Sequence, residues 1–143
     1  METVWDVLLT KTDMEVKKIR VRVQELRDRR DRAAAQKRKL TDLIAEYHGR
    51  LSEIQTRPHN LSEAGSYRQF IVQIQELLAR SEVELTVADE AFSEARQELI
   101  NSESEKLKFE SLVEREKTNI RQQESAKETR STEESATLQY NWK

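Results

Sequence analysis

Apolar residues recur along the chain at alternating intervals of four and three positions, and this spacing holds over two long stretches. Twelve of fifteen repeat positions are apolar in the first stretch, and twelve of sixteen in the second. A mean period of 3.5 residues predicts two α-helices, each with one narrow apolar seam of the coiled-coil kind. The first seam comprises Trp5, Leu9, Thr12, Val16, Ile19, Val23, Leu26, Arg30, Ala33, Lys37, Leu40, Ile44, Tyr47, Leu51 and Ile54. The second comprises Tyr67, Ile71, Ile74, Leu78, Ser81, Leu85, Ala88, Phe92, Ala95, Leu99, Ser102, Lys106, Phe109, Val113, Glu116 and Ile120.

A short break separates the two seams. Pro58 cannot continue the first helix, because it lacks an amide proton and clashes with the preceding turn. Asn60, three residues before Glu63, is suited to cap the second helix, and Ser62 is a rival cap. Because the connection is short and the seams are nearly equal in length, the predicted fold is all-α, a long antiparallel two-helix coiled-coil hairpin. A single unbroken helix that pairs with another chain is the alternative, and Pro58 argues against it.

The pattern predicts one coiled-coil hairpin over the whole chain. We expect a helix over about residues 4–56, a turn over about 57–61, a helix over about 62–122 and a polar tail over 123–143. The tail is set apart because the apolar seam stops after Ile120. We therefore expect a frayed tail that ends in a few apolar residues.

Two capping patterns lie near the start of the chain. Thr3 precedes Asp6 by three residues, and Thr12 precedes Glu15 by the same interval. Either pair resembles a capping box, so the first helix has two candidate starts.

Several seam positions are polar. Arg30 and Lys37 interrupt the first seam, where a charge fixes register and its aliphatic stem packs while the head reaches water. The second seam is softened in the same way by Ser81, Ser102, Lys106 and Glu116.

Charge is distributed unevenly between the two predicted helices. Residues 16–50 contain twelve Lys or Arg against five Asp or Glu, and residues 81–116 contain four against eleven. In a hairpin these stretches face each other, which disfavours pairing of two first helices. A nucleic-acid or anionic-membrane surface is an alternative use of the basic stretch. Its cations, however, are spread around the helix.

The composition offers little for catalysis. Charged residues make up 36% of the chain, and it has no cysteine, two histidines and two glycines. Thiolate chemistry, a zinc site and a glycine-rich phosphate loop are therefore not expected. We expect a protein that binds partners, with no enzyme activity, no cofactor and no metal. No apolar run is long enough to span a bilayer and no secretory signal is apparent, so we expect a cytoplasmic protein.

The segment from Asn60 to Ile71 resembles the turn and second-helix start of the FliJ family of flagellar type III export proteins. The resemblance rests on Leu61-Ser62 after the turn and on Tyr67-x-x-Phe70 entering a long acidic helix. The chain length and the order of helix, turn, helix and polar tail are also similar to that family. The close of the chain, residues 138–143, departs from the family pattern.

The resemblance implies a coiled-coil stalk, similar to that of rotary ATP synthases, that inserts into the export ATPase hexamer and promotes its activity. It also implies contacts with the export gate protein FlhA and with export chaperones, and a location at the inner-membrane export apparatus. No nucleic acid is implied. Carried over by motif, the gate-binding face comprises Phe70, Ile74, Leu77 and Ser81. By analogy with the rotary stalk, the candidate ATPase-binding residues are Trp5, Leu8, Leu9 and Val113.

Two other functions fit the same pattern. One is the corresponding stalk protein of an injectisome secretion system, and the other is a generic coiled-coil adaptor without an ATPase partner.

Overall fold

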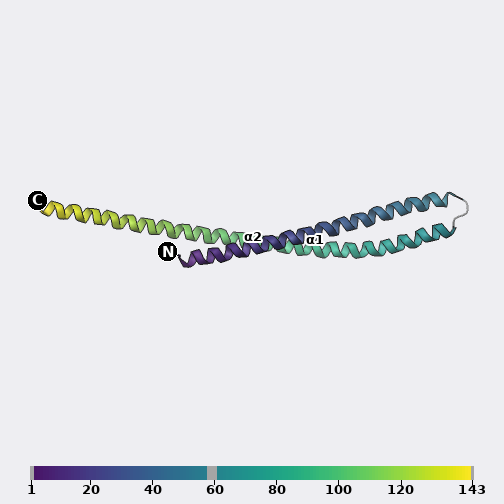
Figure 1. Ribbon diagram of the computed structural model, residues 1–143, viewed down its shortest axis with the longest axis horizontal. Coiled ribbons are helices and arrows are strands. Elements are labelled where there is room, and N and C mark those ends of the chain that lie inside the picture. The colour runs from purple at the N-terminus through teal and green to yellow at the C-terminus, as the bar shows by residue number, and fades with distance from the viewer. Residues whose placement is uncertain (1, 58–60, 143) are drawn as a thin grey trace. The chain divides into compact units, whose positions relative to one another are not determined.

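The computed structural model describes residues 2–57 and 61–142, and it contains two helices. Helix α1 spans Val4–Gln55 and helix α2 spans Leu61–Trp142 (Figure 1). The two helices pack against each other in an antiparallel hairpin, which confirms the predicted fold class. Pro58 and Asn60 lie outside the described residues. Ser62 lies inside α2, so it does not cap that helix.

The chain divides into two compact units. The terminal unit comprises Met1–Lys18 and Ile100–Lys143, and the turn unit comprises Ile19–Leu99. Each unit contains a stretch of α1 beside an antiparallel stretch of α2. In the turn unit, Tyr47 contacts Tyr67; in the terminal unit, Trp5 contacts Phe109.

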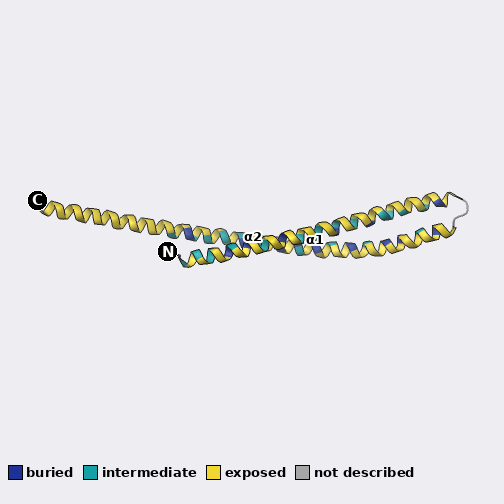
Figure 2. Ribbon diagram, viewed as in Figure 1, coloured by how far each residue is buried: buried dark blue, intermediate teal, exposed yellow. Residues whose placement is uncertain are grey.

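Burial follows the two predicted seams closely (Figure 2). Every seam position is buried or half-buried except the outermost ones, Trp5 and Ile120. Ala64, one step before the second seam, is also buried. The core is thin, because each helix contributes only one stripe of side chains and several of these are alanine or serine.

The turn unit holds a small core around Phe92, which packs with Val23 and Ala95. Two arginines of α1 cover the same ring, since the guanidinium carbons of Arg27 and Arg30 lie 5.5 Å and 4.4 Å from its centroid. Arg30 therefore occupies its seam position by laying its charge on an aromatic face, where the ring quadrupole attracts it.

Ion pairs join the basic helix to the acidic one within the turn unit. Arg29 donates from Nε and Nη2 to Glu84 Oε1, at 3.1 Å and 2.8 Å, and Arg22 Nη1 lies 3.9 Å from Glu98. Both pairs are well exposed, so each contributes little, about 0–1 kcal/mol. Their shared polarity nevertheless favours the antiparallel pairing of basic α1 with acidic α2.

Helix α1 begins with a complete capping box. The backbone N–H and hydroxyl of Thr3 donate to Asp6 Oδ2, each at 3.0 Å, and the N–H of Asp6 donates to Thr3 Oγ1 at 3.3 Å. The hydrogen bond from the Thr3 backbone is the main reason that the pKa of Asp6 lies below its ordinary value of 3.8. Thr12, the other candidate start, lies inside the helix and donates to the carbonyl of Leu8 at 2.8 Å.

The prediction that the second helix ends near residue 122 is wrong, because α2 continues to Trp142. Every described side chain from Lys117 to Asn141 is exposed, which agrees with the loss of the seam. The helix persists because residues 121–142 contain neither Gly nor Pro to stop it. Threonine hydroxyls in this stretch bond back to carbonyls one turn earlier, as from Thr129 to Ser125 at 2.9 Å. We call residues 117–142 the C-terminal arm.

A seam lysine joins the two helices of the terminal unit. Lys106 Nζ lies 2.8 Å from Asp13 Oδ1, and Asp13 also pairs with Lys17 at 3.1 Å. The hydrogen bond from Lys106, and then that from Lys17, holds the pKa of Asp13 below its ordinary 3.8. Because the folded pKa is the lower one, the interaction stabilises the fold above about pH 4 and is lost as the pH falls through the folded pKa.

Replacing Phe92 with alanine should lower the free energy of unfolding by about 3 kcal/mol, because it empties the turn-unit core and uncovers two arginines. Urea denaturation followed by far-UV circular dichroism measures the change. The matched control is Val83→Ala on the same helix, where the valine is 65% exposed. The control should change stability by less than about 0.5 kcal/mol, and equal losses in the two variants would contradict this core assignment.

Substituting Lys106→Met should raise the pKa of Asp13 toward 3.8, because the main hydrogen bond to the carboxylate is removed. An NMR titration of the Asp13 side-chain carboxyl measures this pKa. Lys108→Met removes an exposed lysine two residues away and should leave the pKa of Asp13 unchanged. Identical pKa values in the wild type and Lys106→Met would show that the ion pair does not form in solution.

Candidate functional site

The predicted gate-binding face divides into exposed and buried residues. Phe70 is 51% exposed and Leu77 is 49% exposed, and both lie beside the seam of α2. Ile74 and Ser81 lie within the seam and are only 4% and 9% exposed. The face available to a partner is therefore narrower than the four-residue stripe, and it consists of Phe70 and Leu77.

An aromatic residue from α1 holds Phe70 in place. The rings of Tyr47 and Phe70 stack with centroids 5.8 Å apart and an interplanar angle of 16°. Tyr67 packs on the same tyrosine, with centroids 5.7 Å apart. Such offset pairs add to simple area burial and restrict ring motion. The exposed half of Phe70 is thus presented by a preorganised cluster of rings from both helices.

A charged pair borders this aromatic cluster. Arg50 Nη2 donates to Glu46 Oε1 at 2.6 Å, and the guanidinium carbon lies 5.5 Å from the Tyr47 centroid. The negative charge of Glu46, followed by a hydrogen bond with Tyr67, raises the pKa of Arg50 above its ordinary value. Arg50 therefore remains fully charged beside the rings.

Shallow grooves lie along this edge. The first, of about 330 Å³, borders Phe70, and the second, of about 270 Å³, borders Leu77. The hydroxyl oxygen of Ser81 is buried in the wall of the second groove and has no hydrogen-bond partner among the described residues. The first groove is lined by Tyr47, Arg50, Glu63, Ser66, Tyr67 and Phe70. The second is lined by Ala33, Gln36, Leu40, Leu77, Arg80, Ser81 and Glu84.

The predicted ATPase-binding residues gather in the terminal unit with different exposures. Trp5 is 36% exposed and its ring lies 6.2 Å from that of Phe109, at an angle of 34°. Leu8 and Leu9 are half-buried, whereas Val113 is only 7% exposed. Trp5 is therefore the most accessible of the four, whereas Val113 belongs to the core.

Sequence reasoning missed the contacts made by Tyr47 and Phe109. Both residues were predicted as seam positions, but the contacts of Tyr47 with Phe70 and of Phe109 with Trp5 were not predicted. The sequence contained the signal needed to predict these contacts. In a pair of antiparallel seams, two residues lie opposite each other when their residue numbers add up to a nearly constant value. Tyr47 with Phe70 and Trp5 with Phe109 satisfy that relation.

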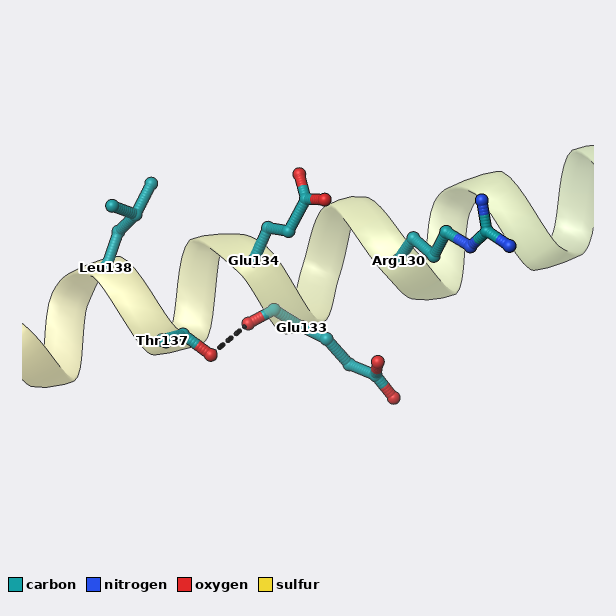
Figure 3. A pocket seen from close by; sticks show the side chains of 5 residues that line it. All are labelled: Arg130, Glu133, Glu134, Thr137 and Leu138. Carbon is teal, nitrogen blue, oxygen red and sulfur yellow. Dashed lines mark hydrogen bonds between the residues drawn. The ribbon is translucent and has the colours of Figure 1, made fainter.

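A surface hollow on the C-terminal arm is not an enclosed site. Figure 3 shows side chains that leave a single helix in different directions, and the one hydrogen bond drawn joins Thr137 Oγ1 to the carbonyl of Glu133 at 2.9 Å. No second element covers these side chains within the described part of the terminal unit, since each of them is exposed.

No candidate centre for metal chemistry is present among residues 2–57 and 61–142, where no three His, Asp or Glu side chains gather around a point. His48 is exposed, and His59 lies outside the described residues. Neither described helix carries an apolar stretch long enough to cross a bilayer.

Comparison with known proteins identifies a family. The family model described as the flagellar FliJ protein matches residues 6–143, which is nearly the whole chain. Neither the curated proteins nor the solved structures contain a match. The match covers the second seam, the C-terminal arm and all of the first seam except Trp5, and so agrees with the resemblance carried by the Tyr67-x-x-Phe70 segment. The chain belongs to the FliJ family and is a component of the flagellar type III protein export apparatus.

Proposed function

We propose that the chain is a stalk-like coiled coil that binds and activates the export ATPase ring through its terminal unit and contacts the export gate protein FlhA through its turn unit. The observation that carries the proposal is the exposed edge of Phe70 and Leu77, where Tyr47 stacks on Phe70. Such a rigid aromatic edge on a helix suits recognition by another protein surface. We further propose that the protein works at the inner membrane through protein partners, and that it handles export chaperones.

The gate contact is assigned to Phe70 and Leu77. Rows of exposed apolar residues one heptad apart bury together when a partner helix or groove covers them. The grooves beside the two residues offer space for partner side chains, and the ion pair between Arg29 and Glu84 borders the second groove. Ile74 and Ser81 are buried in the seam, so they contribute indirectly by packing this stretch of α2 against α1.

The ATPase contact is assigned to Trp5 and Leu8, with Leu9 and Val113 as their support. A tryptophan that is partly exposed and packed at a tilt against a neighbouring ring, as Trp5 is against Phe109, resembles the anchors that dominate protein interfaces. The family match favours the flagellar apparatus over the injectisome stalk. In the turn unit, Arg22 and Arg29 of α1 form ion pairs with glutamates of α2, so part of the basic surface is already neutralised within the chain. This weakens the case for nucleic-acid or membrane binding.

Phe70→Ala should weaken binding to FlhA about tenfold or more, because an interface anchor is truncated. Calorimetric titration of purified FlhA with each variant measures the affinity. Val72→Ala is the matched control, since Val72 is 54% exposed on the same turn of α2 but points away from the Phe70 edge. An unchanged affinity in Phe70→Ala, with helicity intact, would remove the gate assignment.

Trp5→Ala should abolish most of the stimulation of the export ATPase by the chain, because the exposed anchor of the terminal unit is lost. Steady-state ATP hydrolysis by the ATPase, measured with and without the chain, reports the effect. Phe70→Ala serves as the second variant and should stimulate the ATPase as the wild type does. If the wild-type chain raises neither turnover nor hexamer formation, the stalk function is wrong.

A further inference from the structure

Phe70 also borders a groove on its outer side, away from α1. This groove, of about 230 Å³, is lined by Ser66, Gln69, Phe70 and Gln73, which all belong to α2. The four residues are exposed and follow one another at intervals of three, one and three, so they form one strip of the helix surface. We call Ser66, Gln69 and Gln73 the neutral strip. It lies in the turn unit, directly beside the ring that Tyr47 holds.

The neutral strip differs from the rest of this edge because it carries no charge. Charged residues make up 36% of the chain, yet the seven residues from Gln69 to Gln75 include none. The two grooves that also touch α1 each have a basic and an acidic residue in their walls. Charged residues are depleted at the centre of protein interfaces, because an ion that loses its water there must be compensated. The neutral strip is therefore the part of this edge that a partner covers with the smallest desolvation penalty.

The strip also offers hydrogen-bonding groups that the hairpin does not use. Gln69 and Gln73 are four residues apart, so their side chains are neighbours on the helix surface. Each amide has two N–H donors and a carbonyl acceptor, and neither forms a hydrogen bond with another described residue. The hydroxyl of Ser66 donates to the carbonyl of Ser62 at 3.1 Å, and its oxygen can still accept. A partner on the strip therefore meets donors and acceptors beside an aromatic ring.

We propose that the partner segment bound at Phe70 extends onto the neutral strip and is itself uncharged where it does so. This inference rests on the gate contact proposed above, and it specifies the chemistry of the FlhA segment that makes that contact. The segment places an apolar side chain against the exposed half of Phe70. Beside it, backbone groups or uncharged polar side chains pair with the amides of Gln69 and Gln73, since such groups satisfy donors and acceptors without burying an ion. The two glutamines thus determine which segments bind.

Calorimetric titration of purified FlhA with the full chain, repeated at several salt concentrations, tests this inference. The wild-type Kd should change by less than about twofold between about 0.1 and 0.5 M salt, because a neutral contact is hardly screened. Gln73→Glu replaces an amide by a carboxylate of the same shape, and it should raise the Kd about tenfold because a charge is then buried without a counter-ion. The double variant Gln69→Ala with Gln73→Ala should raise the Kd about fivefold through lost hydrogen bonds.

Gln75→Glu is the matched control, because Gln75 is an exposed glutamine on the other edge of the same helix. It should bind FlhA as the wild type does, and circular dichroism checks that each variant keeps its helicity. A wild-type chain that does not bind FlhA overturns the gate contact and this inference together. Where the wild type binds and Phe70→Ala weakens the complex, three results overturn this inference alone: wild-type affinity in Gln73→Glu, a steep rise of the Kd with salt, or an equal loss in Gln75→Glu.

Discussion

Each helix of this protein has only one stripe of side chains to bury, and the rest of the structure depends on that constraint. A helix with a narrow apolar seam is marginal alone in water, and it becomes stable when a second seam covers it. The chain supplies both seams, and residues such as Val16, Ala88 and Phe92 are almost fully buried between them. Because alanine and serine occupy several seam layers, the helices approach closely but bury little area. The fold therefore relies on many weak layers instead of one large core.

The same constraint explains why binding surfaces lie beside the seam. A side chain next to the seam is half-covered by the opposite helix and half-exposed, so it can be held by one helix and offered to a partner at once. Phe70 shows this arrangement, with Tyr47 stacked on one side and half of its surface in solvent. A residue inside the seam, such as Ile74, is buried within the hairpin and leaves almost no surface for a partner. Position relative to the seam thus separates residues that stabilise the fold from residues that can recognise another protein.

The fold was largely predictable from sequence because the seam spacing and burial share one physical cause. The interval of 3.5 residues marks the covered stripe directly, and the structure buries that stripe from Leu9 to Glu116. The end of α2 was not predictable by the same signal. Loss of the seam removes burial, but the local preference of residues 123–142 for helix does not depend on burial. The site was predicted less well, because the exposure of Phe70 and the burial of Ser81 depend on how the opposite helix is rotated.

The charges of the two helices favour one way of pairing them, which the apolar seams alone do not do. Two apolar seams of similar spacing can pair in several ways, including between copies, and burial hardly distinguishes them. The basic character of α1 and the acidic character of α2 favour the pairing seen within the hairpin, as Arg29 with Glu84 and Arg22 with Glu98 illustrate. Each exposed ion pair contributes little, so the preference comes from the sum of many pairs that join a cation of α1 to an anion of α2. Away from the seam the terminal unit carries the same division of charge, with Lys11 and Lys18 exposed on α1 and Glu110 and Glu114 exposed on α2. A charge pattern that organises the fold on the inside is therefore also available for selecting what binds on the outside.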